Sequence, residues 1–297
     1  MKLKISGLSR TYQNGIKALD DLSLEIGEGM FGLLGPNGAG KSTLMRTIAS
    51  IQLPDKGTIM LDDIDVIGDP ISLRKVLGYL PQEFGVYPKI SAAYLLEYFA
   101  ALKGISPASE RTKAVKYALE AVNLFEERNQ YVAGFSGGMK RRFGIAQLLL
   151  ARPKLIIVDE PTAGLDPSER NRFLNVLREI ASTNIIIFST HIVDDIKDLC
   201  NDMAIINRGR ILKQTTPAKA AEEMKGKVWQ RRMERSMLES AESLYFILSS
   251  KYESDSHINV RVYSESIPGD GFAPAEPILE DMYFYSLGKD SKPKGSI

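Results

Sequence analysis

Apolar and polar residues alternate in short runs through the N-terminal part of the chain. Leu22, Leu24 and Ile26 are separated by single polar residues, which is the spacing of a strand with one buried face. The pair Asn14-Gly15 is a turn signal between such runs. The pattern predicts an antiparallel β layer that leads into a continuous apolar strand at residues 30–34.

The spacing becomes helical between about residues 91 and 125. Apolar side chains recur there at helical intervals, and Gly104 and Pro107 interrupt the pattern. A third helical stretch covers about residues 137–150. We therefore expect a helical subdomain, at about residues 83–150, inserted into an α/β core.

On both sides of this insertion the chain alternates between short strands and helices. Expected strands are 57–61, 78–80, 155–158, 184–188 and 203–207, and expected helices are 168–181 and 193–199. Such alternation predicts a layered α/β domain, which we assign to residues 1–215.

From residue 216 the character of the sequence changes again, and we assign residues 216–297 to a C-terminal accessory domain. A strand is predicted at 258–263. A helix is predicted from Pro277, because proline suits the first helical position, to about residue 287. Residues 289–297 are expected to be a frayed end. This part is therefore predicted to contain a strand and a helix.

A glycine-rich loop follows the strand at 30–34 and precedes a helical run. Backbone N–H groups in such a loop turn toward a phosphate chain, and the positive end of the following helix points to the same place. Lys41 can reach the β- and γ-phosphates, and the Ser42 hydroxyl can ligate Mg²⁺. The chain is therefore predicted to bind a nucleoside triphosphate. The loop has the spacing GxxxxGK[ST] and consists of Gly35, Pro36, Asn37, Gly38, Ala39, Gly40, Lys41, Ser42 and Thr43.

The apolar strand at 155–158 ends in two carboxylates, Asp159 and Glu160. An acidic pair at a strand end is often only solvated. Downstream of a phosphate loop it has the form of a Walker B segment. Asp159 is then expected to hold Mg²⁺, and Glu160 to polarise the attacking water as a general base.

Composition narrows the function classes. The 38 Lys and Arg residues nearly balance the 37 Asp and Glu residues, whereas whole-surface nucleic-acid binders are clearly basic. Cys200 is the only cysteine, so no internal disulfide is expected and a reducing compartment fits. Neither a secretory signal nor an apolar stretch of about 20 residues, the length a membrane span requires, is found in the sequence. If the protein works at a membrane, another polypeptide is expected to span it.

Four further motifs, in the family's order within residues 1–215, resemble those of ATP-binding cassette (ABC) ATPases. They resemble the Q-loop, the signature sequence, the D-loop and the H-loop of that family. The motifs are Tyr79-Leu80-Pro81-Gln82, Phe135-Ser136-Gly137-Gly138-Met139, Gly164-Leu165-Asp166 and Ser189-Thr190-His191. The fold implied is a P-loop NTPase core with an antiparallel β layer and an inserted helical subdomain, followed by a small α+β appendage.

The resemblance implies that two ATP molecules are bound between two cassettes. Ser136-Gly137-Gly138 would cap the γ-phosphate held by the other subunit, and Asp166 would cross the interface. Gln82 would contact Mg²⁺ and the attacking water, and His191 would contact the γ-phosphate. Tyr12 lies where the family keeps an aromatic residue that stacks on adenine, although an aromatic residue in a β layer is more often packing.

The signature departs from the family pattern at both ends. Phe135 stands in place of the usual Leu and keeps an apolar plug, and Met139 stands in place of the usual Gln and lacks its amide. The basic run Lys140-Arg141-Arg142 is expected to be a solvated helix face, and the alternative is a contact with lipid headgroups or a membrane partner.

Two function classes remain. Residues 276–285 resemble the ending of bacterial drug-resistance export ATPases, so we expect an exporter's energy-coupling subunit on the cytoplasmic face of the membrane. It would pair with a second ATP-binding subunit, in a homodimer, and drive a separate transmembrane permease. The alternative is a soluble ABC ATPase of translation or nucleic-acid processing, although no nucleic acid is expected as a partner. A degenerate regulator is disfavoured because Lys41, Asp159, Glu160 and His191 are all present.

Overall fold

The computed structural model describes residues 1–291 except 83–84, 86–87, 151–152, 163 and 182–183. The predicted start of the helical subdomain at residue 83 and most of the predicted frayed end therefore lie outside the described residues. Within the described part, no helix combines the length and the apolar composition that crossing a bilayer requires.

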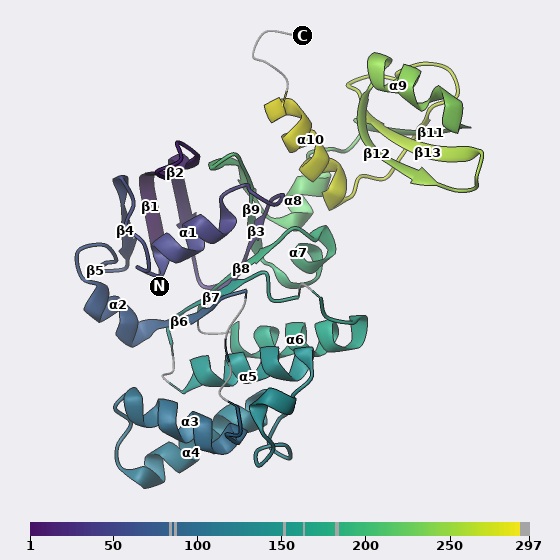
Figure 1. Ribbon diagram of the computed structural model, residues 1–297. Coiled ribbons are helices and arrows are strands. Elements are labelled where there is room, and N and C mark those ends of the chain that lie inside the picture. The colour runs from purple at the N-terminus through teal and green to yellow at the C-terminus, as the bar shows by residue number, and fades with distance from the viewer. Residues whose placement is uncertain (83–84, 86–87, 151–152, 163, 182–183, 292–297) are drawn as a thin grey trace.

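A six-stranded sheet with the order β10-β9-β3-β8-β7-β6 forms the centre of the protein (Figure 1). β3 pairs in parallel with β8 and β9, and β7 pairs in parallel with β6 and β8, whereas β10 is antiparallel to β9. The strands are β3 (Gly29–Leu34), β6 (Leu77–Leu80), β7 (Leu155–Asp159), β8 (Ile185–Thr190), β9 (Asp202–Asn207) and β10 (Arg210–Thr215).

Both faces of this sheet are buried, which explains the continuous apolar runs of its central strands. Leu155 and Ile157 of β7 belong to the core formed with the antiparallel sheet and helix α1 (Lys41–Ile48). Ile156 and Val158 point to the opposite side, where α6 (Pro167–Ile180) and α7 (Val193–Leu199) cover the sheet. Because side chains alternate along a strand, the two cores lie on opposite faces of one layer.

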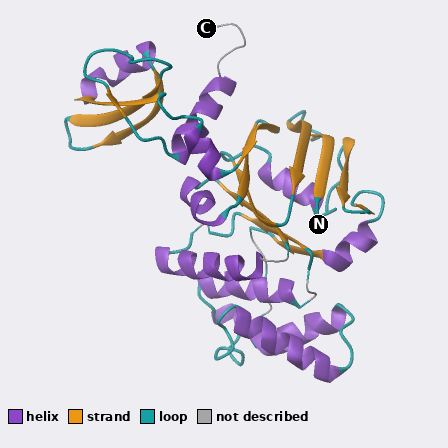
Figure 2. Ribbon diagram, turned by 180° about the vertical axis from the view of Figure 1, so that it is seen from behind, coloured by secondary structure: helices purple, strands orange, loops and turns teal. Residues whose placement is uncertain are grey.

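The predicted antiparallel β layer is present as a four-stranded sheet with the order β2-β1-β4-β5. Helix α1 lies between this sheet and the central one, and α2 (Pro70–Val76) follows β5 (Figures 1 and 2). The arrangement confirms the predicted α/β fold. The strands of the layer are β1 (Leu3–Thr11), β2 (Lys17–Ile26), β4 (Lys56–Leu61) and β5 (Ile64–Asp65).

Three helices and a short 3-10 turn build the inserted helical part: α3 (Ala92–Leu102), α4 (Ala108–Ala121), η1 (Val132–Gly134) and α5 (Gly137–Leu149). The side chains of Ser91 and Ser136 cap α3 and α5 by accepting backbone N–H bonds. α5 contacts α3, α4, β6 and α6, so it connects the insertion to the central layer.

One expectation for this region is wrong. Arg142 of the basic run is 6% exposed rather than solvated, and its Nη1 donates to the carbonyl oxygens of Val122 and Asn123 at 3.1 and 3.0 Å. Those carbonyls lie just after the end of α4, where they lack partners within the helix. Arg142 therefore joins α5 to the end of α4.

The C-terminal residues form a second antiparallel sheet with the order β12-β13-β11-β14. Of its strands, only β13 was predicted. β11 and β12 are half-exposed and carry many polar residues, so the alternation of apolar and polar residues that predicts a strand is weak in them. The same holds for β10 of the central sheet, which was also not predicted. The elements are α8 (Pro217–Glu222), β11 (Val228–Glu234), η3 (Arg235–Met237), α9 (Leu238–Leu244), β12 (Phe246–Tyr252), β13 (His257–Tyr263), β14 (Ala273–Pro274) and α10 (Leu279–Ser291).

Helix α10 connects this sheet to the central one. It begins two residues after Pro277 and contacts α7, α8, β9, β10 and β12, so it lies between the central sheet and the C-terminal one (Figure 1). Asp281 of α10, only 1% exposed, accepts from Arg261 Nε at 2.9 Å and Nη2 at 2.6 Å and from the Ile278 backbone N at 2.8 Å. This two-bond ion pair fixes the helix on β13.

We expect Asp281→Asn to lower the free energy of unfolding of the C-terminal sheet by about 2–3 kcal/mol, because Arg261 then loses its buried counter-charge. Trp229 of β11 is the only tryptophan, so its fluorescence during urea unfolding reports on this sheet. The control Glu280→Gln removes the exposed 3.7 Å contact with Lys251 and should change the free energy by less than about 0.5 kcal/mol. Equal effects of the two variants would contradict this account.

Candidate active site

The phosphate loop joins the carboxyl end of β3 to the first turn of α1. Two of its glycines have left-handed backbone, Gly38 with φ 79° and Gly40 with φ 106°. A Cβ atom on Gly40 would lie 2.5 Å from the Ala18 carbonyl oxygen, and one on Gly35 would lie 2.4 Å from the Ile206 carbonyl oxygen. The loop therefore packs against neighbouring backbone so closely that only glycine fits at these two positions.

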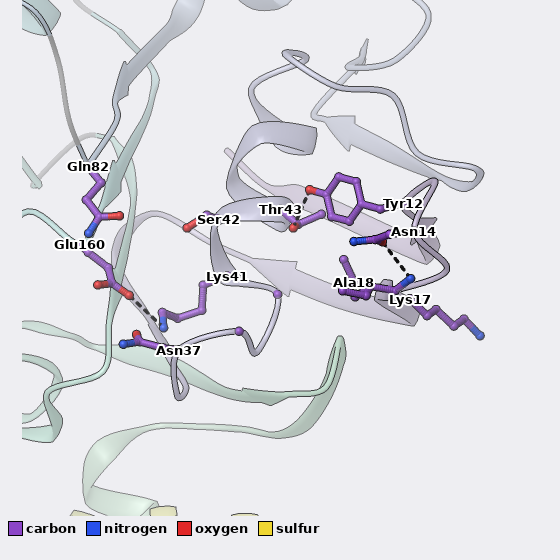
Figure 3. Close-up of a pocket in the computed structure, with 13 residues that line it drawn as sticks. Tyr12, Asn14, Lys17, Ala18, Asn37, Lys41, Ser42, Thr43, Gln82 and Glu160 are labelled. Atoms are coloured by element: carbon purple, nitrogen blue, oxygen red, sulfur yellow. Dashed lines mark hydrogen bonds and ion pairs between the residues drawn. The ribbon is translucent and has the colours of Figure 1, made fainter.

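Lys41 is buried at the start of α1, with 4% of its surface exposed. Its Nζ donates to the carbonyl oxygens of Gly35 at 2.7 Å and Pro36 at 3.1 Å, and lies 3.0 Å from Glu160 Oε1. The loop backbone thus folds around the ammonium group and holds it in front of the Glu160 carboxylate (Figure 3).

Ser189 of β8 contacts both residues of the acidic pair, at the side chain of Asp159 and at the backbone of Glu160. Its hydroxyl donates to Asp159 Oδ1 at 2.6 Å and accepts from the Glu160 backbone N at 3.0 Å. β7 and β8 are paired so that Asp159 lies opposite Ser189, which makes this contact a consequence of the strand register.

The pKa of nearby Tyr79 is raised, mainly by burial and to a lesser extent by the negative charge of Asp159. Its phenol group therefore stays neutral.

Glu160 turns away from the strand with φ 44°, which directs its carboxylate into the site. Its Oε2 lies 3.5 Å from His191 Nδ1, and His191 is 44% exposed at the end of β8. Gln82, after β6, is exposed on the same side of the pocket (Figure 3). The carbonyl oxygens of Pro81 and Gln82 accept from Arg141 Nη1 of α5. One edge of the sheet therefore carries four functional groups: the Lys41 ammonium, the Glu160 carboxylate, the His191 imidazole and the Gln82 amide.

Lys41, Glu160 and Gln82 line a pocket of about 640 Å³, and His191 is not among the lining residues. Tyr12 forms part of its wall, and its hydroxyl is bonded to Thr43 Oγ1 at 3.0 Å, which orients the ring (Figure 3). The wall residues after Tyr12 were not predicted from the sequence, where the turn signal at Asn14-Gly15 was the available sign. The pocket is lined by Tyr12, Asn14, Ile16, Lys17, Ala18, Asn37, Gly38, Gly40, Lys41, Ser42, Thr43, Gln82 and Glu160.

The predicted signature and D-loop residues do not line this pocket. Ser136 is exposed at the N-terminus of α5, and its Oγ accepts from the Met139 backbone N at 3.1 Å. Gly138 packs against Glu169 of α6, since a Cβ there would lie 2.1 Å from Glu169 Oε2. Asp166 caps α6 by accepting from the Glu169 backbone N at 2.9 Å. Ser136, Gly137 and Asp166 thus lie exposed, at or beside two adjacent helix N-termini.

The remaining predicted residues of the site are Ala39 of the phosphate loop and the predicted metal ligands. Ala39 is buried, and its carbonyl oxygen accepts from Gly209 N at 2.9 Å, so it shapes the loop without lining the pocket. Among the described residues, no group of three or more His, Cys, Asp or Glu side chains is arranged to hold a metal ion. Ser42 lines the pocket, whereas Asp159 is 2% exposed and is not among the lining residues.

Comparisons with known proteins agree with this architecture. The protein-family model described as ABC transporter matches residues 19–163. The chain is 36% identical over 210 residues to the uncharacterized ABC transporter ATP-binding protein YxlF of Bacillus subtilis (strain 168), covering 70% of this chain and 69% of that protein. It is 33% identical over 216 residues to the daunorubicin/doxorubicin resistance ATP-binding protein DrrA of Streptomyces peucetius, covering 72% of this chain and 65% of that protein.

Among solved structures, CbiO1 of Clostridium perfringens, part of the ABC transporter complex CbiONQ, is similar with a TM-score of 0.67 and 30% identity. The similarity covers 74% of this chain and 90% of that one. Fold and site together define an ATPase with a phosphate loop. The chain belongs to the ABC transporter family, as an ATP-binding protein.

We expect Gly40→Ala to weaken ATP binding by about 5- to 150-fold, because left-handed backbone and the contact with Ala18 would strain the loop by about 1–3 kcal/mol. Isothermal titration calorimetry measures the affinity. The matched control is Gly27→Ala, where a Cβ would meet no atom within 4 Å and φ is not left-handed. If both variants bind ATP like the wild type, the tight loop geometry is not required.

Proposed function

We propose that this chain is the energy-coupling subunit of a membrane exporter, in which two cassettes close around two ATP molecules and drive a separate permease. The observation that carries the ATP-hydrolysing part is the convergence of Lys41, Glu160 and His191 within 3.0 and 3.5 Å contacts at one edge of the sheet. The exporter part rests on the resemblance to drug-resistance ATPases, one of which is DrrA.

The proposed roles follow from the positions of these groups. A triphosphate cradled by residues 35–43 brings its β- and γ-phosphates to Lys41, where they replace the Glu160 carboxylate as the ammonium's partner. The released Glu160 then polarises the attacking water as general base. His191, next to Glu160, contacts the γ-phosphate, and Tyr12 presents its ring to the adenine.

Magnesium fits the oxygen ligands that the site offers. The ion prefers a few protein ligands and completes its shell with phosphate oxygens and water. We assign Ser42, Asp159 and Gln82 to it, and when bound it would neutralise charge on the phosphates. Ser189 fixes the orientation of the Asp159 carboxylate by its 2.6 Å hydrogen bond, which supports this assignment.

A second cassette would complete each site. Ser136-Gly137-Gly138 lie at the N-terminus of α5, a favourable place for an anion, yet they are outside the pocket of their own chain. If these residues contact the γ-phosphate bound by another copy, both the anion-binding helix N-terminus and its position outside the chain's own pocket are explained. Asp166, exposed near the signature, would lie in the same interface. We propose a homodimer.

An exposed stripe on α3 supports a contact with the permease. Tyr94, Tyr98 and Leu102 are spaced by four residues, lie on one face of the helix and are all exposed. The helix follows the Gln82 segment in the chain, so a protein seated on it would be linked to the nucleotide site. On this proposal the chain lies at the cytoplasmic face of the membrane.

We expect Glu160→Gln to reduce hydrolysis by at least about 100-fold while ATP binding persists, because Gln cannot act as a base. The variant should accumulate as an ATP-bound dimer in size-exclusion chromatography. Glu179→Gln, an exposed change on α6, is the matched control and should keep wild-type turnover and remain monomeric after hydrolysis. Full turnover by the Glu160 variant would refute the assigned base.

The permease contact is tested by purifying the tagged chain from membranes in mild detergent. A near-stoichiometric polytopic membrane protein should accompany the wild type, and Tyr98→Glu should lose most of it because a charge enters the exposed stripe. Tyr252→Glu, at an exposed tyrosine of β12, should retain it. Recovery of ribosomal proteins or nucleic acid in its place would contradict the exporter and favour the soluble alternative.

A further inference from the structure

Asp195 of α7 is a fully buried carboxylate that does not line the nucleotide pocket. Its exposed fraction is 0%. Oδ2 accepts from Thr162 Oγ1 at 2.8 Å and from Thr190 Oγ1 at 3.0 Å, and Oδ1 accepts from Arg170 Nε at 2.6 Å. The three donors come from three separate segments of the chain, so one carboxylate ties those segments together.

Such a group is costly to bury unless it is paired and hydrogen-bonded. Here the Arg170 guanidinium supplies the opposite charge, and the two threonine hydroxyls, themselves buried, supply the remaining bonds. Hydrogen bonds to an ionised acceptor are the strong ones, so the geometry around Asp195 is tightly defined. Loss of one donor would leave the carboxylate under-satisfied and free the segment that carried it.

Two of the three donors lie close in the chain to residues of the proposed catalytic machinery. Thr190 immediately precedes His191, and its Oγ1 also accepts from the Ile192 backbone N at 3.0 Å. The hydroxyl therefore holds the chain on both sides of His191. Thr162 follows Glu160 by two positions, in the segment that leaves β7.

The third donor reaches toward the D-loop. Arg170 lies in the first part of α6, whose N-terminus is capped by Asp166. The Arg170 backbone N also donates to the Asp166 carbonyl oxygen at 2.9 Å. Asp195 is thus connected, through one side chain each, to the segments of His191, Glu160 and Asp166.

We propose that Asp195 is a positioning residue for ATP hydrolysis, which holds the His191 and Glu160 segments in fixed relation to each other and to the Asp166 helix. The proposal rests on the proposed roles of those three residues. Because Asp166 faces the second cassette in that scheme, the carboxylate also connects closure of the dimer to the alignment of base and imidazole. It does so without touching the nucleotide.

A positioning role makes a prediction that a purely structural role does not. Displacing a catalytic group by a fraction of an ångström lowers kcat strongly, whereas ATP affinity depends on residues 35–43 and should persist. Thr190→Val is nearly isosteric and removes only the hydroxyl, and Thr190→Ser keeps it. Thr162→Val provides the same deletion on the Glu160 side, and Asp195→Asn removes the charge itself.

The experiment measures kcat, KM and ATP affinity for the purified full chain, with urea unfolding of each variant. We expect Thr190→Val to lower kcat by about tenfold with KM and affinity within about twofold, and Thr190→Ser to retain at least about half of the wild-type kcat. The double variant Thr162→Val/Thr190→Val should lose less than the product of the single losses, because both act through one carboxylate. Thr112→Val, which deletes a hydroxyl bonded within α4, is the control and should keep wild-type kcat.

Wild-type kcat in both valine variants would overturn the proposal, as would a loss of kcat that merely follows the unfolded fraction or a loss of ATP affinity. Glu160→Gln, measured in parallel, separates this failure from failure of the proposed function. An inactive Glu160 variant together with fully active valine variants refutes the role of Asp195 alone. Full turnover by the Glu160 variant refutes the catalytic assignment on which that role depends.

Discussion

The parallel pairing of β3, β7 and β8 in one register is the constraint on which the rest of the site depends. Leu34 lies opposite Thr190, and Asp159 lies opposite Ser189. The carboxyl ends of the three strands therefore deliver the phosphate loop, the acidic pair and the histidine to the same edge. A shift by one residue would exchange the faces of every side chain on a strand and separate these groups. The two apolar cores on either face are what enforce the register.

Sequence patterns predicted the residues that follow buried strands, because strand ends and motif spacing are both local. The phosphate loop, Asp159, Glu160 and His191 belong to this class, and the structure brings Lys41, Glu160 and His191 together. Contacts between distant segments have no local signature. The contacts of Ser189 with the Asp159 carboxylate and the Glu160 backbone depend on how separate elements pack, and so does the contact of Arg142 with the end of α4. Arg142 was expected to be solvated because a run of three basic residues is usually exposed. In the structure, carbonyl groups at the end of a helix accept hydrogen bonds from its guanidinium group, which allows the charge to be buried.

In the C-terminal appendage, too, local patterns could be predicted from the sequence, whereas contacts between distant segments could not. A helix was predicted from Pro277 to about residue 287, yet the resemblance of residues 276–285 to a family ending did not reveal what this segment does. In the structure, Asp281 of that run pairs with Arg261, and the far end of α10 reaches the cassette, where Asp290 Oδ2 accepts from Asn207 Nδ2 at 2.9 Å. Two residues further, Gly209 N donates to Ala39 of the phosphate loop at 2.9 Å. One turn between β9 and β10 therefore contacts both the appendage and the loop.

The two departures in the signature can be understood from packing. Phe135 is buried and meets Phe143 edge to face with ring centroids 6.1 Å apart, so the larger ring is accommodated within the helical part. Met139 packs its half-buried side chain on the same core, and its backbone N donates a hydrogen bond to Ser136 Oγ. Because that oxygen acts as the acceptor, the Ser136 hydroxyl proton remains available to donate to a phosphate oxygen. The presence of Met139 in place of the usual Gln therefore does not remove the two kinds of donor that an anion at this position needs. These donors are the Ser136 hydroxyl and the backbone N–H groups at the helix N-terminus.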